Sequence, residues 1–118
     1  MKLNYITIIV GDLDKSLKFY TELTELQVIR KINPPAGEIV FLANDDGETM
    51  LELAKIEGVD AVETKSLTLS FLCDGLQKTH SKAIELNYKP SEIFNNPPKP
   101  KYFNLPDPDG IMIEFSQG

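Results

Sequence analysis

Apolar and polar positions alternate along the first half of the chain in a way that predicts one helix and four strands. Residues 3–10 alternate with period two, which indicates a strand with Ile6, Ile8 and Val10 on one face and Tyr5, Thr7 and Ile9 on the other. Leu13, Leu17 and Tyr20 then recur at helical spacing behind Asp12, a residue suited to cap a helix N-terminus. Turn-forming segments at residues 33–37 and 44–47 separate three further predicted strands, over residues 27–31, 38–43 and 49–54.

The second half repeats this order. Residues 66–73 predict a strand with Leu67, Leu69, Phe71 and Cys73 on one face, and Asp74 is expected to cap a helix striped by Leu76, His80, Ala83 and Asn87. Strands are predicted over residues 92–94, 102–105 and 111–116, with a proline-rich loop at 95–100. We therefore expect a first module over about residues 1–55, a link over 56–65 and a second module over about 66–118.

The two halves carry matching carboxylates. Asp12 and Asp74 are 62 positions apart, and so are Glu52 and Glu114. Such a repeat indicates two copies of one small unit, each of the order β-α-β-β-β. The predicted fold class is α+β, in a single domain whose two βαβββ modules form a curled mixed sheet around a cleft. Glu52 and Glu114 are expected to point into that cleft.

Composition narrows the classes of partner. Hydrophobic residues make up 42% of the chain and charged residues 25%, which is typical of a soluble globular protein. The net charge of -6 and the scattered lysines and arginines argue against nucleic acid and membrane surfaces as partners. No apolar run approaches the roughly 20 residues that span a bilayer, and the N-terminus lacks a signal-peptide pattern, so we expect a cytoplasmic protein. The single cysteine excludes an intrachain disulfide.

Glu52 and Glu114 are the leading candidates for chemistry, because each interrupts an apolar strand pattern and a buried carboxylate is costly without a partner. One interpretation is structural: both face a solvated cleft or bond Tyr5, Thr68 or a backbone group. In a second, one of them is a general base whose pKa is raised by apolar walls and by the other carboxylate. In a third, the pair attracts a cationic ligand, with Tyr5, Met50 and Met112 as apolar wall.

The only histidine and the only cysteine carry weaker signals. His80 lies on or near the packed stripe of its helix, so we expect it to be partly buried and bonded to a carbonyl or to water. Cys73 shares a face with Leu69 and Phe71, and nothing near it in sequence would lower its pKa, so we expect a buried, inert thiol.

Two segments resemble a known family. The family is the glyoxalase/bleomycin-resistance/dioxygenase superfamily, also called the vicinal oxygen chelate proteins. Residues 10–20 resemble its opening motif and read Val-Gly-Asp-Leu-Asp-Lys-Ser-Leu-Lys-Phe-Tyr. Residues 107–115 resemble its closing motif and read Asp-Pro-Asp-Gly-Ile-Met-Ile-Glu-Phe. The resemblance implies a pair of βαβββ modules around a cleft that a second subunit frequently completes, hence a homodimer. One departure is the exit of the first helix, where Thr24-Glu25-Leu26 replaces a frequent Leu-Gly-Phe.

The resemblance also supplies four positions at which metal-dependent members hold their ligands, on the first and last strand of each module. These positions are Tyr5, Glu52, Thr68 and Glu114; the repeat offset alone would give Leu67 for the third, but alternation favours Thr68. The nitrogen ligands of glyoxalase I-like members are missing, and one histidine excludes a site with two histidines and one carboxylate. Transition metals prefer imidazole or thiolate together with oxygen, whereas two carboxylates with a phenol and a hydroxyl suit only a hard ion. We therefore expect neither a metal nor another cofactor.

The preferred function is a metal-independent small-molecule binding protein of the glyoxalase/bleomycin-resistance type, with a cationic or aromatic ligand. Its expected cleft is lined by Tyr5, Thr7, Met50, Glu52, Thr68, Ser70, Met112 and Glu114. The alternative is a lyase or isomerase resembling lactoylglutathione lyase, acting on a small carbonyl or thiol-conjugate substrate with Glu52 or Glu114 as base. A third possibility, a degenerate member kept for an interaction surface, has no exposed apolar stripe in its favour.

Overall fold

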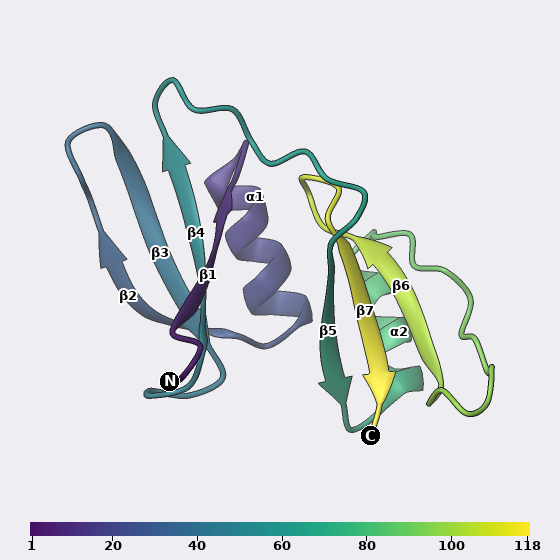
Figure 1. The fold of residues 1–118 in the computed structure, drawn as a ribbon. Coiled ribbons are helices and arrows are strands. Elements are labelled where there is room, and N and C mark those ends of the chain that lie inside the picture. Colours follow the sequence, from purple (N-terminus) through teal and green to yellow (C-terminus); the bar gives the residue numbers. More distant parts are fainter. The chain divides into compact units, whose positions relative to one another are not determined.

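The computed structural model describes all residues from Met1 to Gly118. The chain forms two compact units, Met1–Glu63 and Thr64–Gly118 (Figure 1). Each unit contains its own sheet and its own α-helix.

The first unit is a four-stranded mixed sheet with one helical segment. Its sheet has the order β1-β4-β3-β2, in which β1 runs parallel to β4 and the other neighbours are antiparallel. The elements are β1 (Tyr5–Ile9), α1 (Leu13–Lys18), the π-helical turn η1 (Phe19–Leu23), β2 (Gln27–Ile32), β3 (Gly37–Ala43) and β4 (Met50–Ile56). The predicted strands are therefore confirmed, with boundaries that differ by one or two residues.

The register of this sheet places Glu52 on the face opposite the core leucines of its strand. Leu51 and Leu53 of β4 lie beside Ile6 and Ile8 of β1. Leu51, Leu53 and Ile8 are buried in the core together with Phe19 of η1. Glu52 lies between the two leucines and therefore points to the opposite face, which it shares with Thr7 and with the buried side chains of Phe41 and Ala54.

The ends of the first helix show one confirmed prediction and one departure. Asp12 caps α1, since its Oδ1 accepts a hydrogen bond from Lys15 N at 3.1 Å. At the other end, Glu25 has a left-handed φ of 64°, and Leu26 N donates to Tyr20 O at 3.2 Å. A left-handed residue commonly ends a helix, and glycine is the usual choice there. Here a glutamate occupies that conformation, and the helix ends in a π-helical turn.

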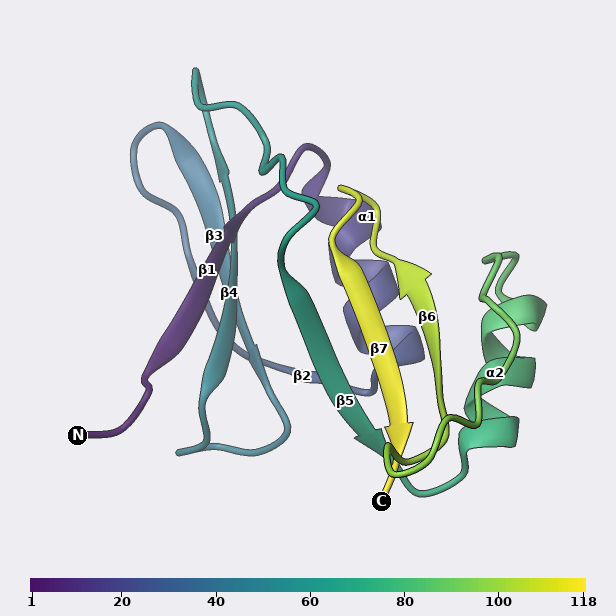
Figure 2. The same cartoon turned by 45° about the vertical axis from the view of Figure 1, so that its right-hand side comes forward.

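The second unit is a three-stranded sheet covered by one helix (Figure 2). Its sheet has the order β5-β7-β6, with β5 parallel to β7 and β6 antiparallel to it. The elements are β5 (Thr68–Cys73), α2 (Leu76–Glu85), β6 (Tyr102–Pro106) and β7 (Met112–Gln117). Phe103, Phe115 and Ile113 form the centre of its core with Leu76 and Ala83 of α2.

Two predictions for the second unit are wrong. The strand expected over residues 92–94 is reduced to a single bridge between Phe94 and Tyr102, in a segment with prolines on both sides. Asp74 does not cap α2: the N-cap is Gly75, which offers no side chain, and Thr79 N bonds Gly75 O. Because β5 continues to Cys73, the first helical turn begins one residue too late for the Asp74 carboxylate to reach it.

The α+β fold of two βαβββ-type modules is confirmed, with the second strand of the second module represented only by that bridge. The register also identifies equivalent positions. Tyr5 pairs with Met50, and Thr68 pairs with Met112. Thr68 rather than Leu67 is therefore the counterpart of Tyr5, as alternation indicated, because the first strands are offset by one residue more than the last strands.

Candidate functional site

The eight residues predicted to line a binding site lie on corresponding faces of the two sheets. In each unit this is the face that alternates with the core residues, and it contains one hydroxyl–carboxylate pair in register, Thr7 with Glu52 and Ser70 with Glu114. The members are Tyr5, Thr7, Met50 and Glu52 in the first unit and Thr68, Ser70, Met112 and Glu114 in the second. The structure thus places four of them together within each unit.

Glu52 is a buried carboxylate without a protein partner. It is 8% exposed, and no hydrogen bond or ion pair reaches it. It pairs in register with Thr7 on one side and Phe41 on the other, and Phe41 packs edge-on against Tyr5 with 5.4 Å between ring centroids. No buried side-chain oxygen lacks a hydrogen-bond partner, so the carboxylate oxygens of Glu52 keep contact with water. This face therefore offers an accessible carboxylate acceptor beside an aromatic pair.

A cation lies at the far end of the same row. Across the four strands the row runs Thr7, Glu52, Phe41 and Arg30, and the Arg30 guanidinium lies 4.9 Å from the centre of the Phe41 ring. Sequence reasoning missed both Phe41 and Arg30. Alternation along residues 38–43 could have placed Phe41 on this face, because its pairing with β4 is regular. Arg30 was not predictable, because the register of β2 against β3 contains an irregularity between Val28 and Arg30. A bulge of this kind changes which side chains share a face.

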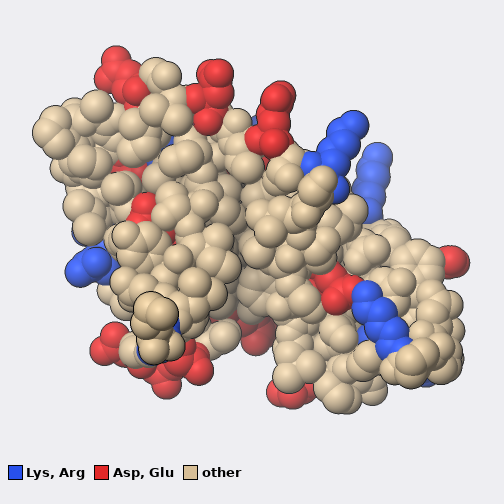
Figure 3. Space-filling view, in the orientation of Figure 1, with Lys and Arg blue, Asp and Glu red and all other residues tan.

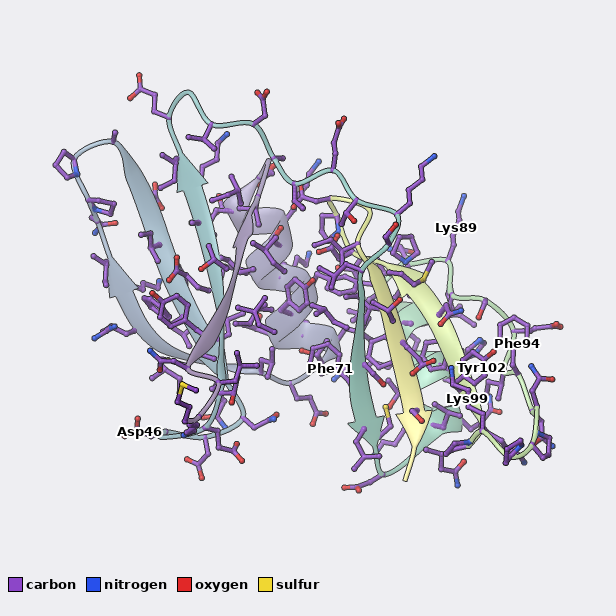
Figure 4. The ribbon with its side chains drawn as sticks, in the orientation of Figure 1. Asp46, Phe71, Lys89, Phe94, Lys99 and Tyr102 are labelled. Atoms are coloured by element: carbon purple, nitrogen blue, oxygen red, sulfur yellow. The ribbon has the colours of Figure 1, made fainter.

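Glu114 is in a different state from Glu52. Ser70 Oγ donates to Glu114 Oε2 at 2.9 Å, and Lys99 Nζ donates to Oε1 at 2.5 Å. The Lys99 ammonium also lies 4.0 Å from the centre of the Tyr102 ring (Figure 4). Both oxygens of this carboxylate are therefore in use, and a lysine from the proline-rich loop provides its positive charge.

These contacts set the direction of two pKa values. The hydrogen bond from Lys99 lowers the pKa of Glu114 and is the largest effect on it. Desolvation raises this pKa by less, and the hydrogen bond from Ser70 lowers it further. The same hydrogen bond raises the pKa of Lys99. Of the two glutamates considered as a general base with a raised pKa, Glu114 therefore fits less well, because the sequence-based interpretation did not include Lys99. A carboxylate held in its charged form by an ammonium is a weaker proton acceptor than the predicted general base.

The donors on these faces do not fit a catalytic transition metal. No group of three His, Cys, Asp or Glu side chains is arranged to hold a metal ion. In the first unit the face offers one carboxylate with a phenol and a hydroxyl, and in the second an ammonium already binds the carboxylate. A positive charge at hydrogen-bonding distance opposes binding of a second cation.

His80 and Cys73 have structural surroundings. His80 Nε2 donates to Ser91 O at 2.7 Å, and its ring packs edge-on against Phe103 at 4.9 Å. This is the carbonyl-bonded helix histidine that the sequence predicted. Cys73 is half-buried, with its sulfur 3.9 Å from Phe71 O. These contacts agree with a structural role for both residues.

Sequence reasoning also missed the residues around Glu114. Asn104 pairs in register with Glu114, and Tyr102 lies two positions away on the same face, with Phe94 packed against it at 5.3 Å. Alternation along residues 102–105 could have placed Tyr102 and Asn104 there. No sequence signal pointed to Lys99, since it lies in an irregular loop whose path is set by tertiary contacts.

Charged side chains of both signs are scattered over the face that Figure 3 draws. On the face drawn in Figure 3, acidic side chains gather mainly on loops at the ends of the strands, and basic side chains form no continuous stripe. No helix is long and apolar enough to cross a membrane.

Comparisons with known proteins agree with this geometry. Residues 2–115 match the sequence profile of the family described as the Glyoxalase/Bleomycin resistance protein/Dioxygenase superfamily. The chain is 32% identical to the protein YwbC of Bacillus subtilis, covering 98% of this chain and 97% of that one. It is 28% identical to a Synechocystis protein named "Probable lactoylglutathione lyase", covering 99% and 95%.

A solved structure extends the comparison. The trypanothione-dependent glyoxalase I of Leishmania major superposes with a TM-score of 0.85 at 25% identity, covering 99% of this chain and 86% of that one.

Proposed function

Because the chain belongs to the glyoxalase/bleomycin-resistance/dioxygenase superfamily, we propose that it binds a small molecule at the polar faces of its sheets without the help of a metal ion. The observation that carries this proposal is the carboxylate of Glu52, which is 8% exposed and has no partner within the protein. Because the oxygens of this carboxylate keep contact with water and have no protein partner, they are free to accept a hydrogen bond or a positive charge from a ligand.

The chemistry around Glu52 favours an organic cation with an aromatic or apolar body. The carboxylate attracts positive charge, while the edge-on pair of Tyr5 and Phe41 supplies aromatic surface and Met50 an adaptable apolar contact. In this proposal Thr7 is a hydrogen-bonding residue beside the carboxylate. On the second sheet Thr68, Ser70, Met112 and Glu114 form the corresponding surface.

The test is a titration with a panel of aromatic organic cations that includes metal-free bleomycin, in the presence of a chelator. Glu52→Gln keeps the shape of the side chain and removes its charge. We expect it to weaken binding about tenfold or more, since a hydrogen bond to a charged group contributes about 1.5–3 kcal/mol. Glu48→Gln, at an exposed residue just before β4, is the matched control and should leave the affinity unchanged.

Two results would contradict the proposal: no member of the panel binds the wild type, or Glu52→Gln binds as tightly as the wild type. Urea unfolding of both variants separates binding from folding. Glu52→Gln should be about as stable as the wild type, because the Glu52 carboxylate makes no hydrogen bond or ion pair within the protein that the substitution would remove.

A second candidate function is supported by the relatives. The Synechocystis and Leishmania proteins are named for lactoylglutathione lyase or glyoxalase I activity, and both cover nearly the whole of this chain. In this alternative Glu52 is the general base, because Glu114 is held by Lys99. Formation of lactoylglutathione from glutathione and methylglyoxal, abolished in Glu52→Gln and seen without added metal, would place the lyase first.

Two further parts of the proposal concern the protein as a whole. We infer a homodimer from the family, and sedimentation equilibrium of the untagged chain measures this directly. The cytoplasmic location expected from the sequence likewise stays a prediction.

A further inference from the structure

A cation already binds the second sheet, and it is the protein's own lysine. Lys99 Nζ donates to Glu114 Oε1 at 2.5 Å and lies 4.0 Å from the centre of the Tyr102 ring. Phe94 packs against the Tyr102 ring with 5.3 Å between centroids, at an angle of 43°. A carboxylate beside aromatic rings is the arrangement that proteins use to hold ammonium groups.

The groups that hold this ammonium are fixed, whereas the lysine is not part of the sheet. Glu114 is in the central strand β7, Ser70 in the neighbouring strand β5 orients its second oxygen, and Tyr102 begins β6. Lys99 lies outside these strands, in the loop before β6, and its side chain is 50% exposed against 12% for Glu114. Figure 4 shows Lys99, Tyr102 and Phe94 together beside β6 and β7.

Because the lysine is half exposed, its ion pair with Glu114 is screened by water and weakly held. The lysine can leave without breaking any hydrogen bond of the β5-β7-β6 ladder, since its own backbone bond, from Lys99 N to Asn96 O, is within the loop. After its departure the carboxylate and the ring would remain in place, held by the strands.

We propose that Glu114, Tyr102 and Ser70 form a binding site for small organic ammonium ions, and that Lys99 is a built-in competitor that such a ligand displaces. The inference rests on the proposed function in taking the ligand to be a small molecule, and it adds a site and a ligand class on the second sheet. A primary alkylammonium is the best match, because it reproduces both contacts of the lysine: hydrogen bonds to the carboxylate and its charge over the ring.

The experiment is a titration with n-butylammonium chloride followed by ¹⁵N–¹H NMR, at constant ionic strength. In Lys99→Gln the competitor is gone, so we expect the affinity for n-butylammonium to rise about two- to fivefold over the wild type, as fits a weakly held ion pair. The amide signals of Ser70, Tyr102 and Glu114 should shift together. Lys101→Gln, which removes an equal charge two residues away, should bind as the wild type does.

Two additional variants remove the site itself. Lys99→Gln combined with Glu114→Gln should lose the binding, and Lys99→Gln combined with Tyr102→Leu should weaken it. Equal affinity of Lys99→Gln and the wild type, or an equal gain in Lys101→Gln, would overturn the proposal and leave Lys99 a purely structural contact. The outcome is independent of Glu52, so failure here and failure of the Glu52 test are distinguishable.

Discussion

At the scale of single residues, the two glutamates of the repeat have opposite surroundings. Glu52 is buried and has no partner, whereas both oxygens of Glu114 accept hydrogen bonds, from Ser70 and Lys99. The sequence predicted that each glutamate lies on the face of its strand opposite the neighbouring apolar residues, because alternation along a strand is a local property. It could not predict their difference, because Lys99 reaches Glu114 from a loop whose path is not encoded in any periodic pattern.

The Lys99–Glu114 pair gives stability a specific dependence on pH. The pKa of Glu114 is lowered from its ordinary value of 4.5, so the pair contributes stability above that pH. This contribution is lost as the pH falls through the lowered pKa and the carboxylate is protonated. Lys99→Gln should therefore be slightly less stable than the wild type at pH 7, because water screens an ion pair whose lysine is half exposed.

Urea unfolding at pH 7 and at about pH 3 measures this difference. At the lower pH the two proteins should converge. Lys101→Gln controls for the change in net charge. A difference between Lys99→Gln and the wild type that stays constant between the two pH values would show that Lys99 acts through packing.

At the scale of elements, the N-termini of the two helices show where a local sequence pattern predicts the capping residue correctly and where it does not. Asp12 and Asp74 have the same place in the sequence repeat, yet only Asp12 caps a helix. The cap is confirmed where the strand ends well before the aspartate, as β1 does at Ile9. It fails where β5 continues to Cys73. The extent of a strand depends on its pairing partner, here β7, and that information is not local.

This difference predicts unequal effects of the same substitution. Asp12→Ala removes the bond to Lys15 N and should lower the free energy of unfolding by about 1 kcal/mol. Asp74→Ala removes no cap and should change it by less than about 0.5 kcal/mol. Thermal or urea unfolding of the two variants under one condition checks the pair. Similar losses at both positions would contradict the assigned N-caps.

At the scale of the whole molecule, the internal repeat and the two terminal motifs predicted the α+β fold and the family, and both are confirmed. Each sheet encodes its polar face in period-two alternation, which made the eight candidate residues predictable as two sets of four. Arg30 and Lys99 were not predictable, because a strand irregularity places the first and a proline-rich loop the second. The comparisons identify the family.

The central claim is that this member of the family works without a metal ion, and calorimetric titration of the untagged protein with nickel tests it most directly. The account predicts no saturable heat at sub-millimolar nickel for the wild type, because each polar face offers a single carboxylate and one of these already binds Lys99. Stoichiometric nickel binding that is weakened by both Glu52→Gln and Glu114→Gln would contradict it, and would place a metal-dependent lyase or isomerase first.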